Sequence, residues 1–129
     1  MSEKYIVKES KAGNDIKSCI IIGLYDDYEG FRIILENDTG VFGVYFEDNL
    51  IYRNADEGDR LGSLSALSNK KNELGIIYEV EDSEFIKWFV EENSEKYNKS
   101  ELMHTAVLSQ NDWIDVISLT QPKIKNLTE

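Results

Sequence analysis

The chain has 129 residues, a length that fits one domain whose hydrophobic core needs no disulfide or structural metal. Its 25 Asp and Glu residues against 14 Lys and Arg residues give a net charge of −11, which disfavours nucleic acid and anionic lipid as partners. A content of 41% hydrophobic and 11% aromatic residues excludes an acidic disordered chain, which is poor in both.

The first part of the chain predicts antiparallel strands separated by tight turns. Residues 17–25 form a β-rich run, and its consecutive isoleucines predict a strand that is covered on both faces. Residues 31–36 and 41–47 alternate between apolar and polar side chains and flank the Asn37–Gly40 turn. Residues 50–53 follow a second turn, so these runs together predict an antiparallel meander. The residues expected on its buried face are Phe31, Ile33, Leu35, Phe42, Val44 and Phe46.

The rest of the chain predicts two helices and three strands. Leucines at positions 61, 64 and 67 predict a short first helix of about three turns, which ends at residues 70–72. Residues 75–80 predict a strand, and residues 102–108 and 113–119 predict a final hairpin.

The second helix, after residue 82, is the most distinct element of the sequence. Asp82 or Ser83 is suited to cap it, because a side-chain oxygen there accepts hydrogen bonds from unpaired backbone N–H groups. Apolar residues then recur at helical spacing, and Trp88 borders the apolar stripe. The members of this stripe are Phe85, Ile86, Phe89 and Val90.

These elements predict an α+β fold in a single domain over residues 1–129. We expect one antiparallel sheet, formed by the N-terminal meander and the C-terminal hairpin, with two helices packed on one of its faces. Residues 1–4 and 122–129 are expected to be frayed.

The negative charge belongs to the middle of the chain. Residues 1–20 carry a balance of +1, residues 21–95 carry −12, and residues 96–129 are neutral. A field of one sign attracts partners of the opposite sign, here a basic protein. The opening residues hold no leader and no run long enough to span a membrane, so we expect a cytoplasmic protein.

His104 is the only histidine and Cys19 the only cysteine. We expect Cys19, beside the isoleucine run, to be a buried and reduced thiol. His104 is in phase with the apolar residues of its predicted strand, which favours a structural or hydrogen-bonded role. No Gly-x-Ser-x-Gly turn accompanies it. We therefore expect no enzyme, although a hydrolase that uses His104 with a nearby carboxylate or with Cys19 remains an alternative.

We expect no cofactor and no metal site. One histidine and one cysteine supply too few of the ligands that zinc prefers. The acidic loop that starts at Asn54 departs from the EF-hand pattern, because Gly58 falls at position five rather than six. Glycine-rich phosphate-binding loops are absent from the sequence.

Acidic residues lie beside aromatic residues at three places: the first acidic turn, a loop after the meander, and the second helix. Aromatic side chains supply contact area in protein interfaces, and carboxylates steer a basic partner toward them. The predicted partner-binding residues are Asp26, Asp27, Tyr28, Glu29, Asp56, Glu57, Asp59 and Trp88.

Several segments in the last third of the chain resemble a known group of proteins. The segments are Ser83–Glu92, Leu102–Thr105 and Asn111–Ser118, followed by Pro122. They are similar to a group of small uncharacterised bacterial cytoplasmic proteins, some of which look like immunity proteins of toxin systems. The resemblance contains no catalytic motif and carries no functional residue over to this chain.

The leading hypothesis is an acidic, non-enzymatic binding protein, monomeric or dimeric, that caps a basic partner such as a nuclease toxin. The alternatives are a DNA-mimic regulator, the hydrolase that uses His104, and a small-ligand binding module with an aromatic pocket beneath the meander. Carboxylates at phosphate-like intervals favour the mimic, and a deep pocket favours the ligand module. A His104 side chain sealed in the core counts against the enzyme.

Overall fold

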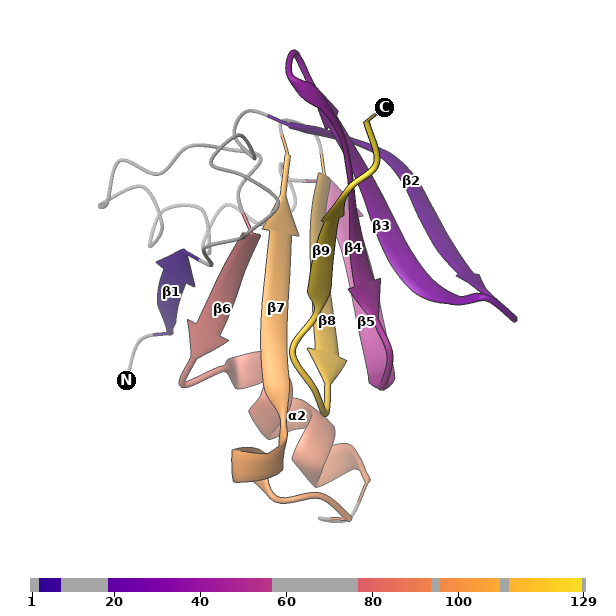
Figure 1. Cartoon of the computed structure of the whole chain (residues 1–129). Helices are drawn as coiled ribbons and strands as arrows, with labels where there is room; N and C mark the ends of the chain where they lie inside the picture. Colours follow the sequence, from indigo (N-terminus) through magenta and orange to yellow (C-terminus); the bar gives the residue numbers. More distant parts are fainter. Residues whose placement is uncertain (1–2, 8–18, 57–76, 94–95, 110–111, 129) are drawn as a thin grey trace.

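The computed structural model describes residues 3–7, 19–56, 77–93, 96–109 and 112–128, which form two antiparallel sheets (Figure 1). The five-stranded sheet has the order β1 (Lys4–Val7), β6 (Ile77–Glu81), β7 (Met103–Leu108), β8 (Asp112–Ser118) and β5 (Asn49–Asp56). The four-stranded sheet has the order β2 (Ile20–Asp27), β3 (Gly30–Asn37), β4 (Gly40–Phe46) and β9 (Lys123–Asn126). The described part of the chain also holds one α-helix, α2 (Glu84–Glu92), and a 3-10 turn, η2 (Lys99–Glu101).

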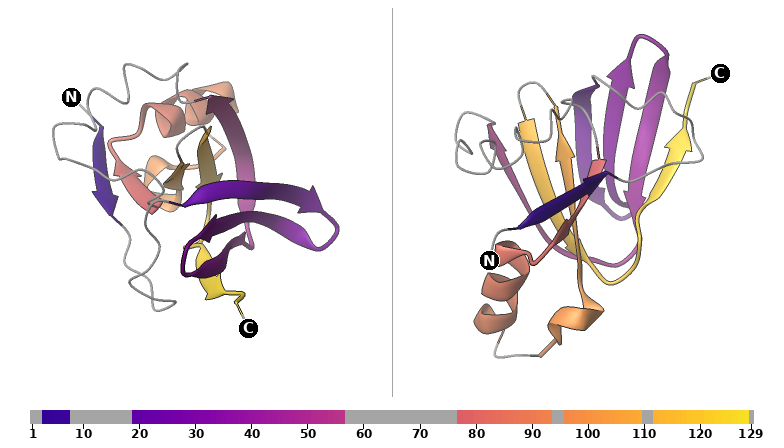
Figure 2. Two further views of the ribbon diagram at one scale, coloured as in Figure 1. Left: turned by 90° about the horizontal axis from the view of Figure 1, so that it is seen from above. Right: turned by 90° about the vertical axis from the view of Figure 1, so that its left-hand side faces the viewer.

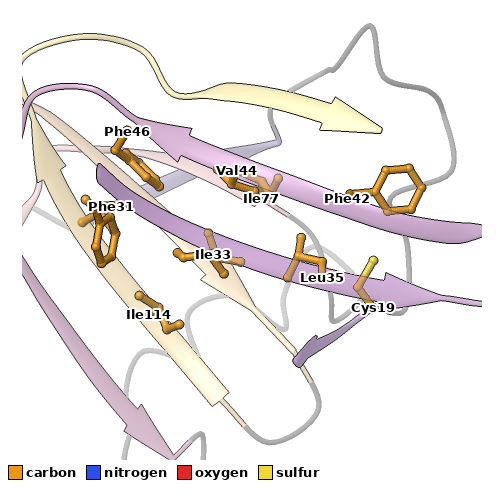
Figure 3. Close-up of a cluster of buried hydrophobic side chains, with 11 residues drawn as sticks. Cys19, Phe31, Ile33, Leu35, Phe42, Val44, Phe46, Ile77 and Ile114 are labelled. Atoms are coloured by element: carbon orange, nitrogen blue, oxygen red, sulfur yellow. The ribbon is translucent and has the colours of Figure 1, made fainter. Parts of the chain in front are cut away.

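The main core lies between the two sheets. The predicted alternation on β3 and β4 is confirmed, because all six apolar side chains expected to face inward are buried (Figure 3). They meet Ile77 of β6 together with Ile114 and Val116 of β8. Strands with one apolar face pack in this way because burying that face removes it from water.

The opposite face of the five-stranded sheet is also buried, and α2 packs on part of it. The register sets His104 opposite Ile117 and Ile117 opposite Ile51, so these three residues share this face. Phe85 and Ile86 of α2 pack against Ile117 there. Figure 1 and the two views of Figure 2 place α2 at the end of the molecule away from the β3–β4 hairpin. The fold therefore has three layers at this end.

The predicted single sheet with a meander is wrong, because β5 leaves β4 and pairs with β8 of the other sheet. Both faces of β5 are used. Tyr52 stacks on Phe31 in the core between the sheets, with ring centroids 4.6 Å apart, whereas Ile51 packs with α2. A strand that is covered on both faces belongs in the middle layer, and β9 takes the place beside β4 instead.

The prediction that the isoleucine run is covered on both faces is also wrong. Ile20 and Ile22 are exposed, because they point away from the core against which Ile21 packs. The pairing with β3 shifts register between Ile21 and Gly23, which marks a β-bulge. The extra residue allows Ile21 and Leu24, three positions apart, to pack against the same core.

The second predicted helix is confirmed as α2, and the final hairpin is confirmed as β7 and β8. The first predicted helix, which contains Leu61, Leu64 and Leu67, lies outside the described residues. The two ends of the chain differ from the expected frayed segments. Lys4 already pairs with Glu81 in the five-stranded sheet, and residues 123–126 form β9 against β4.

Candidate functional site

Helix α2 begins at a strained turn and a side-chain cap. Strand β6 ends at Glu81, and Asp82 then adopts a φ of 54°, a left-handed conformation that is uncommon for residues other than glycine. Ser83 caps the helix, because its Oγ accepts a hydrogen bond of 3.0 Å from the backbone N–H of Ile86. Of the two predicted caps, Ser83 is therefore the one used.

Ser83 also starts a buried chain of hydrogen bonds. Its Oγ lies 2.6 Å from His104 Nδ1, and His104 Nε2 lies 2.6 Å from Asp115 Oδ1. Two more donors reach the same carboxylate: Arg53 Nε at 2.8 Å and Trp113 Nε1 at 3.2 Å. Arg53 and Asp115 are cross-strand partners in the β5–β8 register, which explains how they meet.

Ser83, His104 and Asp115 are the residue types of a catalytic triad, but His104 and Asp115 are not accessible to a substrate. His104 is 1% exposed and Asp115 is 0% exposed. Both ring nitrogens of His104 are engaged, and the Ser83 hydroxyl is engaged in capping α2. A general base must exchange a proton with a bound substrate, and a sealed ring does not meet one. The arrangement instead suits fastening the start of α2 to strands β7 and β8.

The outer end of this network is a surface pocket, here named the α2 pocket, of ≈ 340 Å³ lined by Ile51, Arg53, Phe85 and Trp88. The Arg53 guanidinium carbon lies 4.1 Å from the centroid of the Phe85 ring, a cation–π contact. Phe85 and Trp88 stack with centroids 6.0 Å apart. Trp88 is 47% exposed, so a large aromatic side chain of α2 remains open to solvent beside a fixed cation.

Carboxylates surround the exposed tryptophan on the helix. Glu84, Glu91 and Glu92 stand four residues before, three after and four after Trp88, which places them next to it on the helix surface. All three are exposed. We name these three residues and Trp88 the α2 face. Residues 79–92 hold six carboxylates against one lysine, Lys87, a local balance of −5. Lys87 pairs with Glu84 at 3.1 Å.

The predicted cluster Asp26, Asp27, Tyr28 and Glu29 lies at the β2–β3 hairpin. Tyr28 is 96% exposed at the turn. Arg32 holds the turn from the side, with ion pairs of 2.7 Å to Asp27 and 3.5 Å to Glu29. The hydrogen bond from Arg32 holds the pKa of the Asp27 carboxyl below its usual value. The carboxylates of this turn are therefore largely engaged within the chain.

Basic residues of β9 lie near the same hairpin. Lys123 pairs with Glu47 at 2.6 Å and lowers the pKa of that carboxyl, and Lys125 lies 4.8 Å from the Tyr45 ring. These side chains line a cleft of ≈ 450 Å³ together with Tyr28 and Glu29. Four carboxylates stand here against Arg32 and two lysines, a balance of only −1. These cations offset most of the negative charge of the hairpin.

The structure does not bring the predicted partner-binding residues together. Figure 1 shows the β2–β3 hairpin projecting from the right side of the molecule, whereas α2, which carries Trp88, lies at the bottom. Asp56 is the last residue of β5 and stands opposite Asp112 in the backbone register. It therefore lies at the far end of β5 from Ile51. Glu57 and Asp59 lie outside the described residues. The predicted partner-binding residues that the structure describes therefore lie on separate surfaces.

Three residues of this site were not singled out from the sequence: Ser83 beyond its capping role, Asp115 and Arg53. Asp115 had a detectable signal, because it shares the strand phase of Trp113 and Ile117 and must therefore be buried with them. A buried carboxylate needs partners. The sequence does not say which ones, since Arg53 approaches from a strand 62 residues away.

Cys19 is buried as expected, and burial raises the pKa of its thiol. Among the residues described, no three His, Cys, Asp or Glu side chains converge in a way that could hold a metal ion. None of the helices described is long and apolar enough to cross a membrane.

The chain matches no protein-family model, and the comparisons with curated proteins and with solved structures gave no match either. The site therefore has to be interpreted from its own geometry.

Proposed function

We propose that this chain is a non-enzymatic binding protein that docks on a basic protein through the α2 face. The observation that carries the proposal is the exposure of Trp88 among three exposed carboxylates on a helix that is fixed to the sheet. Exposed tryptophans are frequent energetic centres of protein interfaces, and the surrounding acids steer a cationic surface onto them.

The rigidity of α2 supports this function. The cap at Ser83 and the buried bonds to His104 and Asp115 hold the helix in one position before a partner arrives. A preorganised surface loses less conformational entropy on binding than a mobile one. An inhibitor of the immunity type, which covers the substrate groove of a basic toxin such as a nuclease, would use a surface of this kind.

The β2–β3 hairpin takes second place in this proposal. Tyr28 is more exposed than Trp88, but Arg32 engages Asp27 and Glu29, and Lys123 and Lys125 lie nearby. These cations weaken the attraction for a basic partner. The hairpin therefore serves as the matched control for the α2 face.

The test is affinity capture from the organism that carries the gene, with the unchanged chain, Trp88→Ala and Tyr28→Ala as baits. We expect a basic protein to be retained at low salt, released at high salt because exposed charges are screened, lost with Trp88→Ala and kept with Tyr28→Ala. If the Trp88→Ala bait retains the basic protein and the Tyr28→Ala bait loses it, the interface lies at the hairpin and not on the α2 face. A capture that none of these changes affects would reject the proposal.

A further inference from the structure

We infer that the α2 pocket receives one aromatic side chain of the partner, flanked in the partner's sequence by Lys or Arg. The inference rests on the proposed function and names the chemistry of the anchor residue. It starts from Arg53, whose side chain is 44% exposed although its guanidinium is held from within the protein.

Two contacts fix this guanidinium. Its Nε donates to the buried Asp115 at 2.8 Å, and its central carbon lies 4.1 Å from the centroid of the Phe85 ring. Its terminal nitrogens have no hydrogen-bond partner among the residues described. Aromatic rings can contact a guanidinium from two sides, and Phe85 contacts this one from one side. An incoming aromatic ring can stack on the other and enclose the cation between two rings.

The other walls of the pocket also suit a flat apolar group. Ile51, Phe85 and Trp88 line it, and the planes of Phe85 and Trp88 lie only 16° apart. Aromatic rings gain energy from offset stacking beyond the area that they bury. A volume of ≈ 340 Å³ is at the small end of ligand pockets, so it favours one side chain over a larger ligand.

The charges around the pocket decide what flanks the aromatic residue. Glu84, Glu91 and Glu92 stand next to Trp88, one wall of the pocket, on the helix surface, so lysine or arginine residues that flank the anchor are attracted to these carboxylates. An acidic anchor is disfavoured, because these carboxylates repel it and Asp115 already pairs with Arg53. The occupant with the best complementarity is therefore an aromatic residue within a basic segment.

The probes are three blocked peptides with the sequences Lys-Lys-Tyr-Lys-Lys, Lys-Lys-Leu-Lys-Lys and Lys-Lys-Gly-Lys-Lys, titrated into the full chain. NMR signals of the Arg53 Nε–H and the Trp88 indole N–H report binding at the pocket. We expect the tyrosine peptide to bind about threefold to fivefold more tightly than the glycine peptide, the size of an exposed cation–π contact. The leucine peptide is expected to lie near the glycine peptide.

Arg53→Lys keeps the charge beside Asp115 but removes the planar group. We expect it to reduce the tyrosine peptide to the affinity of the glycine peptide, whereas Arg32→Lys, which alters the matched cation–π contact with Tyr25, leaves the preference intact. Comparison of the peptides on the unchanged chain needs no variant, so a folding defect of Arg53→Lys would not weaken the test. Equal binding of all three peptides, a preference for leucine, or no response of the two signals would overturn the inference.

The result also separates this inference from the proposed function. If all three peptides bind equally and Glu91→Gln/Glu92→Gln weakens all of them, the acidic docking face stands and the aromatic anchor is wrong. If no peptide binds and no basic protein is captured, the proposed function fails as well.

Discussion

His104 Nε2 lies 2.6 Å from Asp115 Oδ1, and both side chains are sealed from solvent between strands β7 and β8 and helix α2. Arg53 and Trp113 also donate to this carboxylate, which stabilises its ionised form. With a neutral ring, Nε2–H donates to Asp115 and Nδ1 accepts the Ser83 hydroxyl proton. The Ser83 oxygen then remains free to accept the Ile86 N–H, so the serine hydroxyl, both ring nitrogens of His104 and the Trp113 indole N–H all have partners.

Asp115→Ala should be among the most destabilising single substitutions in the described fold. It leaves a buried imidazole and an indole N–H without their acceptor and removes the partner of a half-exposed guanidinium, and each unsatisfied buried group costs about 1–3 kcal/mol. Urea unfolding measures the loss. Asp112→Asn, in the same strand, is the control and should change stability by less than about 0.5 kcal/mol. Similar effects of both substitutions would contradict the network.

Ser83→Ala should lower the free energy of unfolding by about 2 kcal/mol. It removes the cap of α2, worth about 1 kcal/mol, and leaves a buried ring nitrogen without its partner. Ser100→Ala in η2 is the matched control and should have little effect, since Ser100 is exposed.

The same serine distinguishes a structural network from a catalytic one. A fluorophosphonate probe, which labels activated serine nucleophiles, should not modify Ser83 in the folded chain. Stoichiometric labelling of Ser83 that disappears with His104→Ala would show that the site is catalytic after all.

Local patterns predicted the hairpins and α2 well, because each depends on residues close in sequence. Alternation on β3 and β4 specifies which face is buried, and the stripe with its cap specifies α2. The partner strand of β5 was not predictable in this way. Its pairing with β8 joins residues such as Arg53 and Asp115, which are far apart in the chain and carry no shared local signal.

The candidate site shows the same division. Trp88 and its neighbouring acids were found because helical spacing places them together. The pocket beside Trp88 was missed, since Ile51 and Arg53 reach it only after β5 crosses to the other sheet. The cations near the hairpin acids were not predictable either, because the positions of Lys123 and Lys125 depend on the pairing of β9 with β4.

Cys19 should make the fold less stable at alkaline pH. Burial raises the pKa of its thiol, against a smaller opposing hydrogen bond from Asn37. The unfolded thiol therefore ionises first as the pH rises past about 8.5, and the free energy of unfolding falls from there. Cys19→Ala should show a shallower alkaline decline in urea unfolding. A thiol reagent at neutral pH should react only as the chain unfolds; rapid reaction of the native protein would contradict this burial.

The Asp27–Arg32 pair should contribute stability at neutral pH that is lost in acid. Since the folded pKa of Asp27 is lowered, the contribution is full above the ordinary carboxyl pKa of about 3.9 and disappears as the pH falls through the lowered value. Asp27→Asn should therefore unfold more easily than the unchanged chain at pH 7, and the two should converge in strong acid. A difference that is constant with pH would show that the ion pair is not its source.

The most direct test of the docking face compares two double variants that remove the same amount of charge. Glu91→Gln/Glu92→Gln changes the α2 face, and Glu36→Gln/Asp38→Asn changes exposed positions at the β3–β4 turn. The measured quantity is the dissociation constant for the captured basic partner at low salt. We predict about tenfold weaker binding for the first variant, equal to about 1.4 kcal/mol, and less than twofold for the second. Equal weakening by both variants would mean that only net charge matters and would contradict a docking surface on α2.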